Sequence, residues 1–172
     1  KALRRRMAYV PQETVLFAAS ARDNLRYGRW DATDDQIWEA ARLANAEGFL
    51  RELPDGLNTD LGEGGARLSG GQRQLLAIGQ ALMARPKVLL LDEPTAGLSP
   101  QVAQDLFALV HQIRDGGMAV LMVEQNALDA LQVSDRAYVL VDGSNHVEGQ
   151  ARALAADPDI RALFLGGRAA AT

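Results

Sequence analysis

Residues 88–94 read VLLLDEP, an apolar run that ends in two acids and a proline. A short and fully apolar run of this kind predicts a parallel strand that is buried on both faces. Its acids, Asp92 and Glu93, then lie at the carboxyl end of the strand, where open α/β sheets bind their ligands. We therefore expect a strand that leads into a ligand-binding edge.

Further strands and helices alternate around this run. The apolar spacing predicts helices over 71–84 and 100–114, and Thr33 is suited to cap another. Strands that alternate with helices indicate a layered α/β fold. The remaining apolar runs predict strands at 7–10, 119–123, 137–141 and 146–148. We expect the strand at 119–123 to be buried on both faces, like the one at 88–92.

The bulk composition limits the classes of function. The chain has 172 residues, enough for one domain with a hydrophobic core. Its net charge of −4 gives no broad electrostatic attraction to nucleic acid. It contains no cysteine, which excludes disulfides and thiolate metal sites, and no apolar stretch approaches the ~18–20 residues that span a bilayer. Because the chain begins almost inside a predicted strand, we expect it to be a piece of a longer polypeptide.

A second notable stretch, LSGGQ, occupies residues 68–72 at the start of a predicted helix whose buried stripe is Leu75, Ile78 and Leu82. A helix N-terminus presents free N–H groups and the positive end of a dipole. The two glycines would let a phosphate approach this backbone with no Cβ in the way. The same pattern is also typical of a plain turn with a serine cap, so both interpretations stay open.

The adjacent acids Asp92 and Glu93 point more strongly to chemistry. Neighbouring carboxylates repel each other and resist desolvation, so they need a cation or a catalytic role. Asp92 is suited to hold Mg²⁺ through water, and Glu93 to orient or deprotonate an attacking water. The alternative is an acidic pair that caps the turn before Pro94.

Together these stretches resemble one family in their order and spacing. The sequence is similar to the carboxyl-terminal part of the ATPase domain of ABC transporters, and the similarity covers nearly the whole chain. It rests on Gln12 after a strand, LSGGQRQ (68–74), VLLLDEP (88–94), AGLS (96–99) and VEQN (123–126).

The resemblance implies a fold and its cofactors. The expected fold is α/β, a P-loop NTPase-like three-layer sandwich with a parallel sheet, truncated at the N-terminus, plus a small α-helical signature subdomain. Residues 20–85 would form that subdomain, 1–19 and 86–165 the α/β core, and 166–172 a tail. The expected cofactors are ATP and Mg²⁺.

The resemblance also implies a role for single residues. Gln12 is similar to the Q-loop glutamine, which senses Mg²⁺ and the attacking water and contacts the membrane subunit. Asp92 has the position of the Walker B aspartate on Mg²⁺, and Glu93 that of the catalytic base. Gln125 has the position of the switch histidine, and Ser99 closes the D-loop.

By the same resemblance, LSGGQ is the signature motif, which caps the γ-phosphate of ATP held by the opposite subunit. The residues expected to bind nucleotide in this way are Leu68, Ser69, Gly70, Gly71 and Gln72. The implied partners are a second ABC ATPase domain and a transmembrane subunit, at the cytoplasmic face of the inner or plasma membrane. No nucleic-acid partner is expected.

Three features depart from the family pattern. The sequence contains no GxxxxGK[ST] motif, the Walker A loop that binds phosphates, so we expect the isolated chain to bind ATP poorly and to be inactive. Gln125 can donate a hydrogen bond to a phosphate but carries no positive charge. Ser99 replaces an aspartate, which weakens the expected contact between subunits.

The sequence therefore allows two functions. In the first, the chain belongs to a motor that hydrolyses Mg-ATP in a nucleotide-sandwich dimer and drives substrate translocation. In the second, it is a non-catalytic fragment, a signature-motif donor or interaction module that hydrolyses nothing alone. DNA-repair ATPases with related motifs match less well, because their long coiled-coil insertion is missing and the chain is acidic.

The two halves resemble different branches of the family. Residues 7–74 are similar to exporter ATPase domains, whereas 75–167 are similar to ATPase subunits of branched-chain amino-acid importers, which commonly share the glutamine at Gln125. The direction of transport therefore stays open. A recombinant gene, an engineered chimera or a mosaic reading frame would each give this pattern.

Several apolar and aromatic residues outside the motifs also carry expectations. We expect Trp30 and Trp38 to pack in the core of the helical subdomain, and Tyr9 to pack on its strand. Residues 15–17, an apolar stretch in a predicted loop, either form an exposed patch for a partner or are buried under that subdomain.

Overall fold

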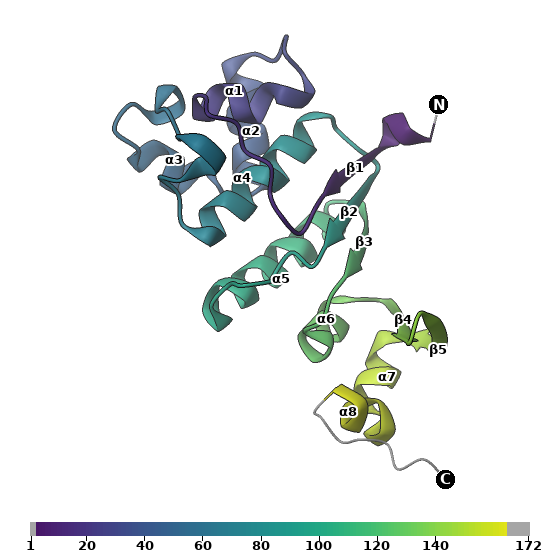
Figure 1. Ribbon diagram of the computed structural model, residues 1–172. Coiled ribbons are helices and arrows are strands. Elements are labelled where there is room, and N and C mark those ends of the chain that lie inside the picture. Colours follow the sequence, from purple (N-terminus) through teal and green to yellow (C-terminus); the bar gives the residue numbers. More distant parts are fainter. Residues whose placement is uncertain (1–2, 165–172) are drawn as a thin grey trace. The chain divides into compact units, whose positions relative to one another are not determined.

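The computed structural model describes residues 3–164, which fall into two compact units (Figure 1). The first unit runs from Lys1 to Val123 and the second from Glu124 to Thr172. The tail expected at 166–172 lies outside the described residues, and the expected limits of the helical subdomain stay predictions. Within the described part of the chain, no helix is both long enough and apolar enough to cross a membrane.

A parallel sheet forms the centre of the first unit, which confirms the predicted fold class. In the register of this sheet, Met7 lies opposite Val88, and Val88 lies opposite Ala119. The carboxyl ends of the strands therefore meet at one edge, with the middle strand flanked on both sides. The strands, in their hydrogen-bonded order, are β1 (Met7–Val10), β2 (Val88–Asp92) and β3 (Ala119–Val123).

Helices occupy the chain between these strands. Thr33 caps the helix after it, as predicted: its Oγ1 accepts a hydrogen bond from the Gln36 N–H at 3.4 Å. The Gln36 Oε1 in turn accepts one from the Thr33 N–H at 3.2 Å, which completes a capping box. The helices and 3₁₀ turns of the first unit are η1 (Arg4–Arg6), α1 (Ala21–Leu25), η2 (Arg26–Gly28), α2 (Asp34–Leu43), α3 (Glu47–Glu52), η3 (Gly56–Asn58), η4 (Glu63–Gly65), α4 (Gly70–Met83) and α5 (Pro100–Asp115).

The sheet has one buried face and one open face. Leu89 and Leu91 of β2 are buried in a core that α4 and α5 also form. On the other face, Leu121 and Val123 of β3 are 60% and 57% exposed. The expectation that β2 and β3 are buried on both faces is therefore wrong, because the helices that share this core pack on a single face of the sheet.

The buried side of α4 is wider than the predicted stripe. Ile78 and Leu82 are buried as expected, but Leu75 is only half-buried and Leu76 is fully buried instead. The stripe widens because α4 contacts β1 as well as α1 and α2. Gly79 permits the close approach of α1: a Cβ at this position would lie 2.9 Å from Leu25 Cδ2.

The second unit is a hairpin packed with short helices. The strands of the hairpin pair antiparallel and are joined at Asp142 and Gly143, whose φ angles of 49° and 76° are left-handed, as a two-residue turn requires. The second strand is longer than predicted, and α7 was not predicted. The elements are α6 (Ala127–Val133), β4 (Arg136–Val141), β5 (Ser144–Gln150), α7 (Ala151–Ala156) and α8 (Pro158–Phe164).

The two tryptophans differ in their surroundings. Trp38 is half-buried against the core, and the Arg51 guanidinium lies 4.2 Å from the centre of its ring. Trp30, by contrast, is 60% exposed, so the expectation that it packs in the core is wrong. Its ring contacts Tyr27 edge-on at 5.7 Å, which places it in a surface cluster of aromatic side chains.

Candidate functional site

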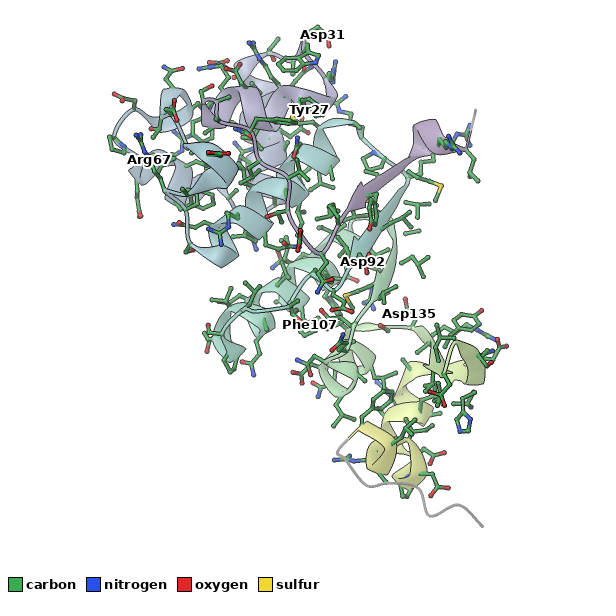
Figure 2. All side chains as sticks on the ribbon, viewed as in Figure 1. Tyr27, Asp31, Arg67, Asp92, Phe107 and Asp135 are labelled. Carbon is green, nitrogen blue, oxygen red and sulfur yellow. The ribbon has the colours of Figure 1, made fainter. Side chains whose placement is uncertain are left out.

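Asp92, the last residue of β2 (labelled in Figure 2), and Glu93 directly after it accept hydrogen bonds from β1 and from the loop that follows β1. Because β1 and β2 run parallel, the segments that leave them lie side by side. Gln12, two residues past the end of β1, donates a hydrogen bond from Nε2 to Glu93 Oε2 at 3.1 Å. The fold thus brings together two residues that are 81 positions apart in the sequence.

Asp92 has a different partner, which the sequence did not reveal. The Tyr9 hydroxyl donates a hydrogen bond to Asp92 Oδ2 at 2.9 Å. The expectation that Tyr9 is a packing residue is wrong, because 57% of its surface is exposed. This hydrogen bond is the main cause that raises the pKa of Tyr9 above its ordinary value, with desolvation and the negative charge of the carboxylate adding to it.

The backbone at Glu93 adopts an uncommon conformation. Its φ of 43° lies in the left-handed region, which glutamate seldom occupies. Two hydrogen bonds hold it there: the Glu93 N–H donates to the Val123 carbonyl at 2.8 Å, and the Glu93 carbonyl accepts from the Ala96 N–H at 3.0 Å. Strained residues of this kind cluster at functional sites, where the surrounding fold supports them.

The start of α4 is held by a capping box. The Ser69 hydroxyl accepts from the Gln72 N–H at 3.2 Å, and Gln72 Oε1 accepts from the Ser69 N–H at 2.9 Å. The Leu68 side chain is buried, and its carbonyl accepts a hydrogen bond from Arg73 at 2.9 Å. Leu68 therefore anchors the stretch in the core, while the helix start beyond it is partly exposed.

The second glycine of LSGGQ has a packing role that the sequence did not show. A Cβ at Gly71 would lie 2.6 Å from Val102 Cγ1 on α5, closer than real Cβ atoms approach. A Cβ at Gly70 would meet Leu98 Cδ2 at 3.4 Å. Any larger residue at position 71 would therefore displace Val102 or the backbone, which gives the glycine a packing role whether or not a phosphate binds there.

A short segment with two turns connects Glu93 to this packed surface. The Leu98 N–H donates to the Thr95 carbonyl at 3.1 Å, and Thr95 itself is buried. Ser99 then caps α5, with its hydroxyl accepting from the Val102 N–H at 3.5 Å. The residues between Glu93 and Ser99 thus join the acidic end of β2 to α5, and Leu98 and Val102 face the two glycines at the start of α4.

Comparisons with known proteins place this arrangement in a family. The family profile described as "ABC transporter" matches residues 1–96. The branched-chain amino acid transport ATP-binding protein BraG of Pseudomonas aeruginosa is 38% identical over 166 residues, which cover 96% of this chain and 69% of BraG. The chain belongs to the ABC transporter ATPase family.

Other relatives of this ABC ATPase are longer proteins. The heterocyst differentiation ATP-binding protein HepA of Nostoc is 40% identical over 82% of the chain, which spans 23% of HepA. ABC transporter B family member 14 of Arabidopsis thaliana is 42% identical over 83% of the chain, which spans 11% of that protein. Among solved structures, a bacterial Atm1-family ABC exporter with ATP bound matches with a TM-score of 0.79 and 30% identity, over 98% of this chain and 29% of the exporter chain.

Family membership accounts for the α/β fold with a parallel sheet, as the sequence predicted. Nucleotide binding and a membrane-associated role are properties of this class of ATPase domain. The amino acid transport protein BraG and the Atm1-family exporter each match nearly the whole chain, so the expected division into an exporter-like half and an importer-like half stays a prediction.

The ABC ATPase motif residues do not all fall in one unit. Gln12, Asp92 and Glu93 lie in the first unit and form the cluster described above. Gln125 lies in the second unit, two residues after the end of β3, and is exposed. Its carbonyl accepts a hydrogen bond from the Ala127 N–H at 2.8 Å, just before α6 begins.

The oxygen donors at the acidic end of β2 are compatible with Mg²⁺. Among the described residues, no group of three or more histidines, cysteines or acids could hold a metal ion. Mg²⁺ needs fewer protein ligands, since it binds through one or two carboxylates together with water and phosphate oxygens. The Asp92 carboxylate is a donor of this kind, and the Gln12 amide adds a neutral oxygen donor.

Proposed function

We propose that this chain works as part of an ABC transporter motor, in which Mg-ATP hydrolysis drives the movement of a substrate across a membrane. The acidic end of β2 carries the proposal. There Glu93 is held in a left-handed conformation, hydrogen-bonded to Gln12, and directly follows Asp92. Strained backbone and adjacent carboxylates at the ligand-binding edge of a parallel sheet are typical of a catalytic site, and this supports the proposal.

In this proposal each polar residue of the cluster has a distinct task. Asp92 and the Gln12 amide oxygen would hold Mg²⁺, which would supply positive charge beside the phosphates. Glu93 orients a water molecule for in-line attack on the γ-phosphate and accepts its proton. The hydrogen bond from Gln12 fixes the direction of the Glu93 carboxylate. Gln12 therefore takes part both in binding Mg²⁺ and in orienting the catalytic base.

The start of α4 supports a role between subunits. The first N–H groups of a helix have no backbone carbonyl one turn earlier that could accept their hydrogen bonds. In α4, Gly70 and Gly71 are the first two residues and carry such N–H groups. We infer that a second ABC ATPase domain presents its nucleotide to this helix start, so that ATP is sandwiched between two subunits. In this arrangement the signature motif and the D-loop serine contact nucleotide from the other subunit, while Gln125 contributes to hydrolysis. The residues that contact nucleotide are Leu68, Ser69, Gly70, Gly71, Gln72 and Ser99.

An exposed apolar surface supports a transmembrane partner. Val15 is 59% exposed and Phe17 is 37% exposed, whereas Leu16 between them is buried. The Phe17 ring lies 4.5 Å from that of Tyr27, which in turn contacts Trp30. Exposed aromatic clusters of this kind mark protein interfaces. We infer that a transmembrane subunit covers this surface at the cytoplasmic face of the membrane.

The test is Glu93→Gln in the intact transporter that contains this chain. Replacing a general base should lower ATP turnover by about 10²- to 10⁴-fold, while nucleotide affinity stays near that of the wild type. Glu52→Gln, which changes an exposed glutamate at the end of α3, is the matched control and should keep full turnover. Full turnover by Glu93→Gln would refute the role given to Glu93.

A second candidate function for the 172 residues is that of a signature-motif donor, which completes a partner's nucleotide site and hydrolyses nothing alone. The 172 residues contain no GxxxxGK[ST] motif to hold the β- and γ-phosphates. The melting temperature of the 172-residue chain discriminates the two. An increase with Mg-ATP would show that the chain binds nucleotide by itself, and an unchanged value would favour the donor function.

A further inference from the structure

Tyr9 is not one of the motif residues to which the resemblance gives a role, yet it contacts the proposed metal-binding carboxylate. We infer that Tyr9 is a positioning residue that orients Asp92 for the cation, a role that rests on the proposed function. The observation behind it is the 2.9 Å hydrogen bond from the Tyr9 hydroxyl to Asp92 Oδ2.

The strand register explains how this contact arises. Tyr9 lies opposite Leu90 in the pairing of β1 with β2, and Asp92 follows Leu90 by two residues on the same face of the sheet. The hydroxyl lies at the far end of the tyrosine ring, so it can reach diagonally across to the next strand. The contact therefore depends on the length of a tyrosine side chain and on the parallel register.

Burial does not account for this tyrosine. The side chain is 57% exposed and lies on the open face of the sheet, like Leu121 at 60%. A phenylalanine would cover the same apolar surface, so packing alone gives no reason for the hydroxyl. Among the described side chains, Tyr9 is the one seen to donate a hydrogen bond to the Asp92 carboxylate.

The hydrogen bond has a consequence for metal binding. It occupies Oδ2 and limits rotation of the carboxylate, so that Oδ1 keeps a defined direction for a cation. Groups that hydrogen-bond a ligating carboxylate fix the geometry of the ligand, and their removal typically costs 10- to 100-fold in metal affinity. Tyr9 is thus suited to tune Mg²⁺ affinity without touching the cation.

The experiment measures Mn²⁺ binding by electron paramagnetic resonance in the intact transporter, in the presence of a non-hydrolysable ATP analogue. The variants are Tyr9→Phe, Asp92→Asn and the double variant. Tyr138→Phe is the matched control, because Tyr138 is 56% exposed and lies on β4 in the second unit. Binding of the analogue without divalent cations is measured alongside, as a readout that loss of the metal should not move.

We expect Tyr9→Phe to raise the Kd for Mn²⁺ by about 10- to 100-fold, with unchanged metal-free binding of the analogue. Tyr138→Phe should bind Mn²⁺ like the wild type, and Tyr9→Phe should add nothing once Asp92 is already asparagine. If Asp92→Asn loses Mn²⁺ while Tyr9→Phe binds it normally, the positioning role is wrong and the proposed function stands. If Asp92→Asn also binds Mn²⁺ normally, the proposed function fails as well.

Discussion

The start of α4 and the end of β2 both carry motif residues, but they are built on different principles. At the start of α4, the hydrogen bonds of the capping box and the contact of Gly71 with Val102 account for most of the sequence by folding alone. At the end of β2, Glu93 is in a left-handed conformation, and adjacent carboxylates are held by Tyr9 and Gln12. The comparison teaches that capping and packing explain one motif stretch, whereas neither gives a reason for the left-handed glutamate and the adjacent carboxylates of the other.

The largest effect on stability is expected where packing dominates. Gly71→Ala should lower the free energy of unfolding by about 1–3 kcal/mol, because the new Cβ would collide with Val102 Cγ1. Gly48→Ala is the matched helix substitution, since no atom lies within 4 Å of a Cβ there, and it should stabilise the chain by ~0.5–1 kcal/mol. Urea denaturation of both variants measures the difference.

If Gly71→Ala lowers the free energy of unfolding and Gly48→Ala raises it, the loss at position 71 comes from packing rather than from alanine in a helix. Val102→Ala should recover part of the loss in Gly71→Ala, since it removes the atom that the Cβ would meet. Equal stability of Gly71→Ala and the wild type would show that the second glycine of LSGGQ is not required by packing.

The next effect is expected at Glu93 and has the opposite sign. Glu93→Gly should raise the free energy of unfolding by up to about 1 kcal/mol, because glycine adopts a positive φ without the strain that other residues carry there. The same variant should lose turnover, as a stability–activity trade-off predicts. Thermal denaturation gives the first result and an ATPase assay of the intact transporter gives the second. A less stable Glu93→Gly would mean that the Gln12 contact outweighs the backbone strain.

The smallest effect concerns Glu47, an acid with an ordinary structural role. Hydrogen bonds from Arg51 and then Arg42 lower the pKa of this carboxyl below its usual value. Its contribution to stability is therefore present above the pKa of an unfolded glutamate and is lost as the pH falls through the lowered, folded-state value. Denaturation midpoints at pH 7 and pH 3 measure it.

Glu47→Gln should be less stable than the wild type at pH 7, and the difference in the free energy of unfolding should disappear at pH 3. A gap that stays constant with pH would show that the ion pairs of Glu47 contribute nothing that depends on its charge. Such an acid contrasts with Glu93, whose substitution is expected to act on turnover first.

Much of the local structure could be predicted from the sequence. The apolar run before Asp92 indicated β2, and the serine and threonine caps indicated where α4 and α2 begin, since these signals depend on neighbouring residues only. The open face of the sheet was not predictable, because an apolar strand reads the same whether one face or both are covered. The Tyr9–Asp92 contact joins residues 83 positions apart, and nothing within either local stretch announces it.

The strain at Glu93 and the packing role of Gly71 were missed for the same reason. The φ of Glu93 depends on a hydrogen bond to Val123, which follows from the order of strands in the sheet. The glycine at 71 is required by a helix that begins about thirty residues later. Sequence therefore revealed which residues carry the motifs, and the fold revealed what each of them contacts.

The central claim is that the acidic end of β2 and the start of α4 bind the same terminal phosphate from two subunits. The most direct measurement is a structure of the intact transporter, trapped as a dimer with Mg²⁺ and a non-hydrolysable ATP analogue. We predict a γ-phosphate within hydrogen-bond distance of the Ser69 hydroxyl and the Gly71 N–H of one subunit, with Mg²⁺ beside Asp92 and a water beside Glu93 of the other. A γ-phosphate bound away from both features would contradict the account.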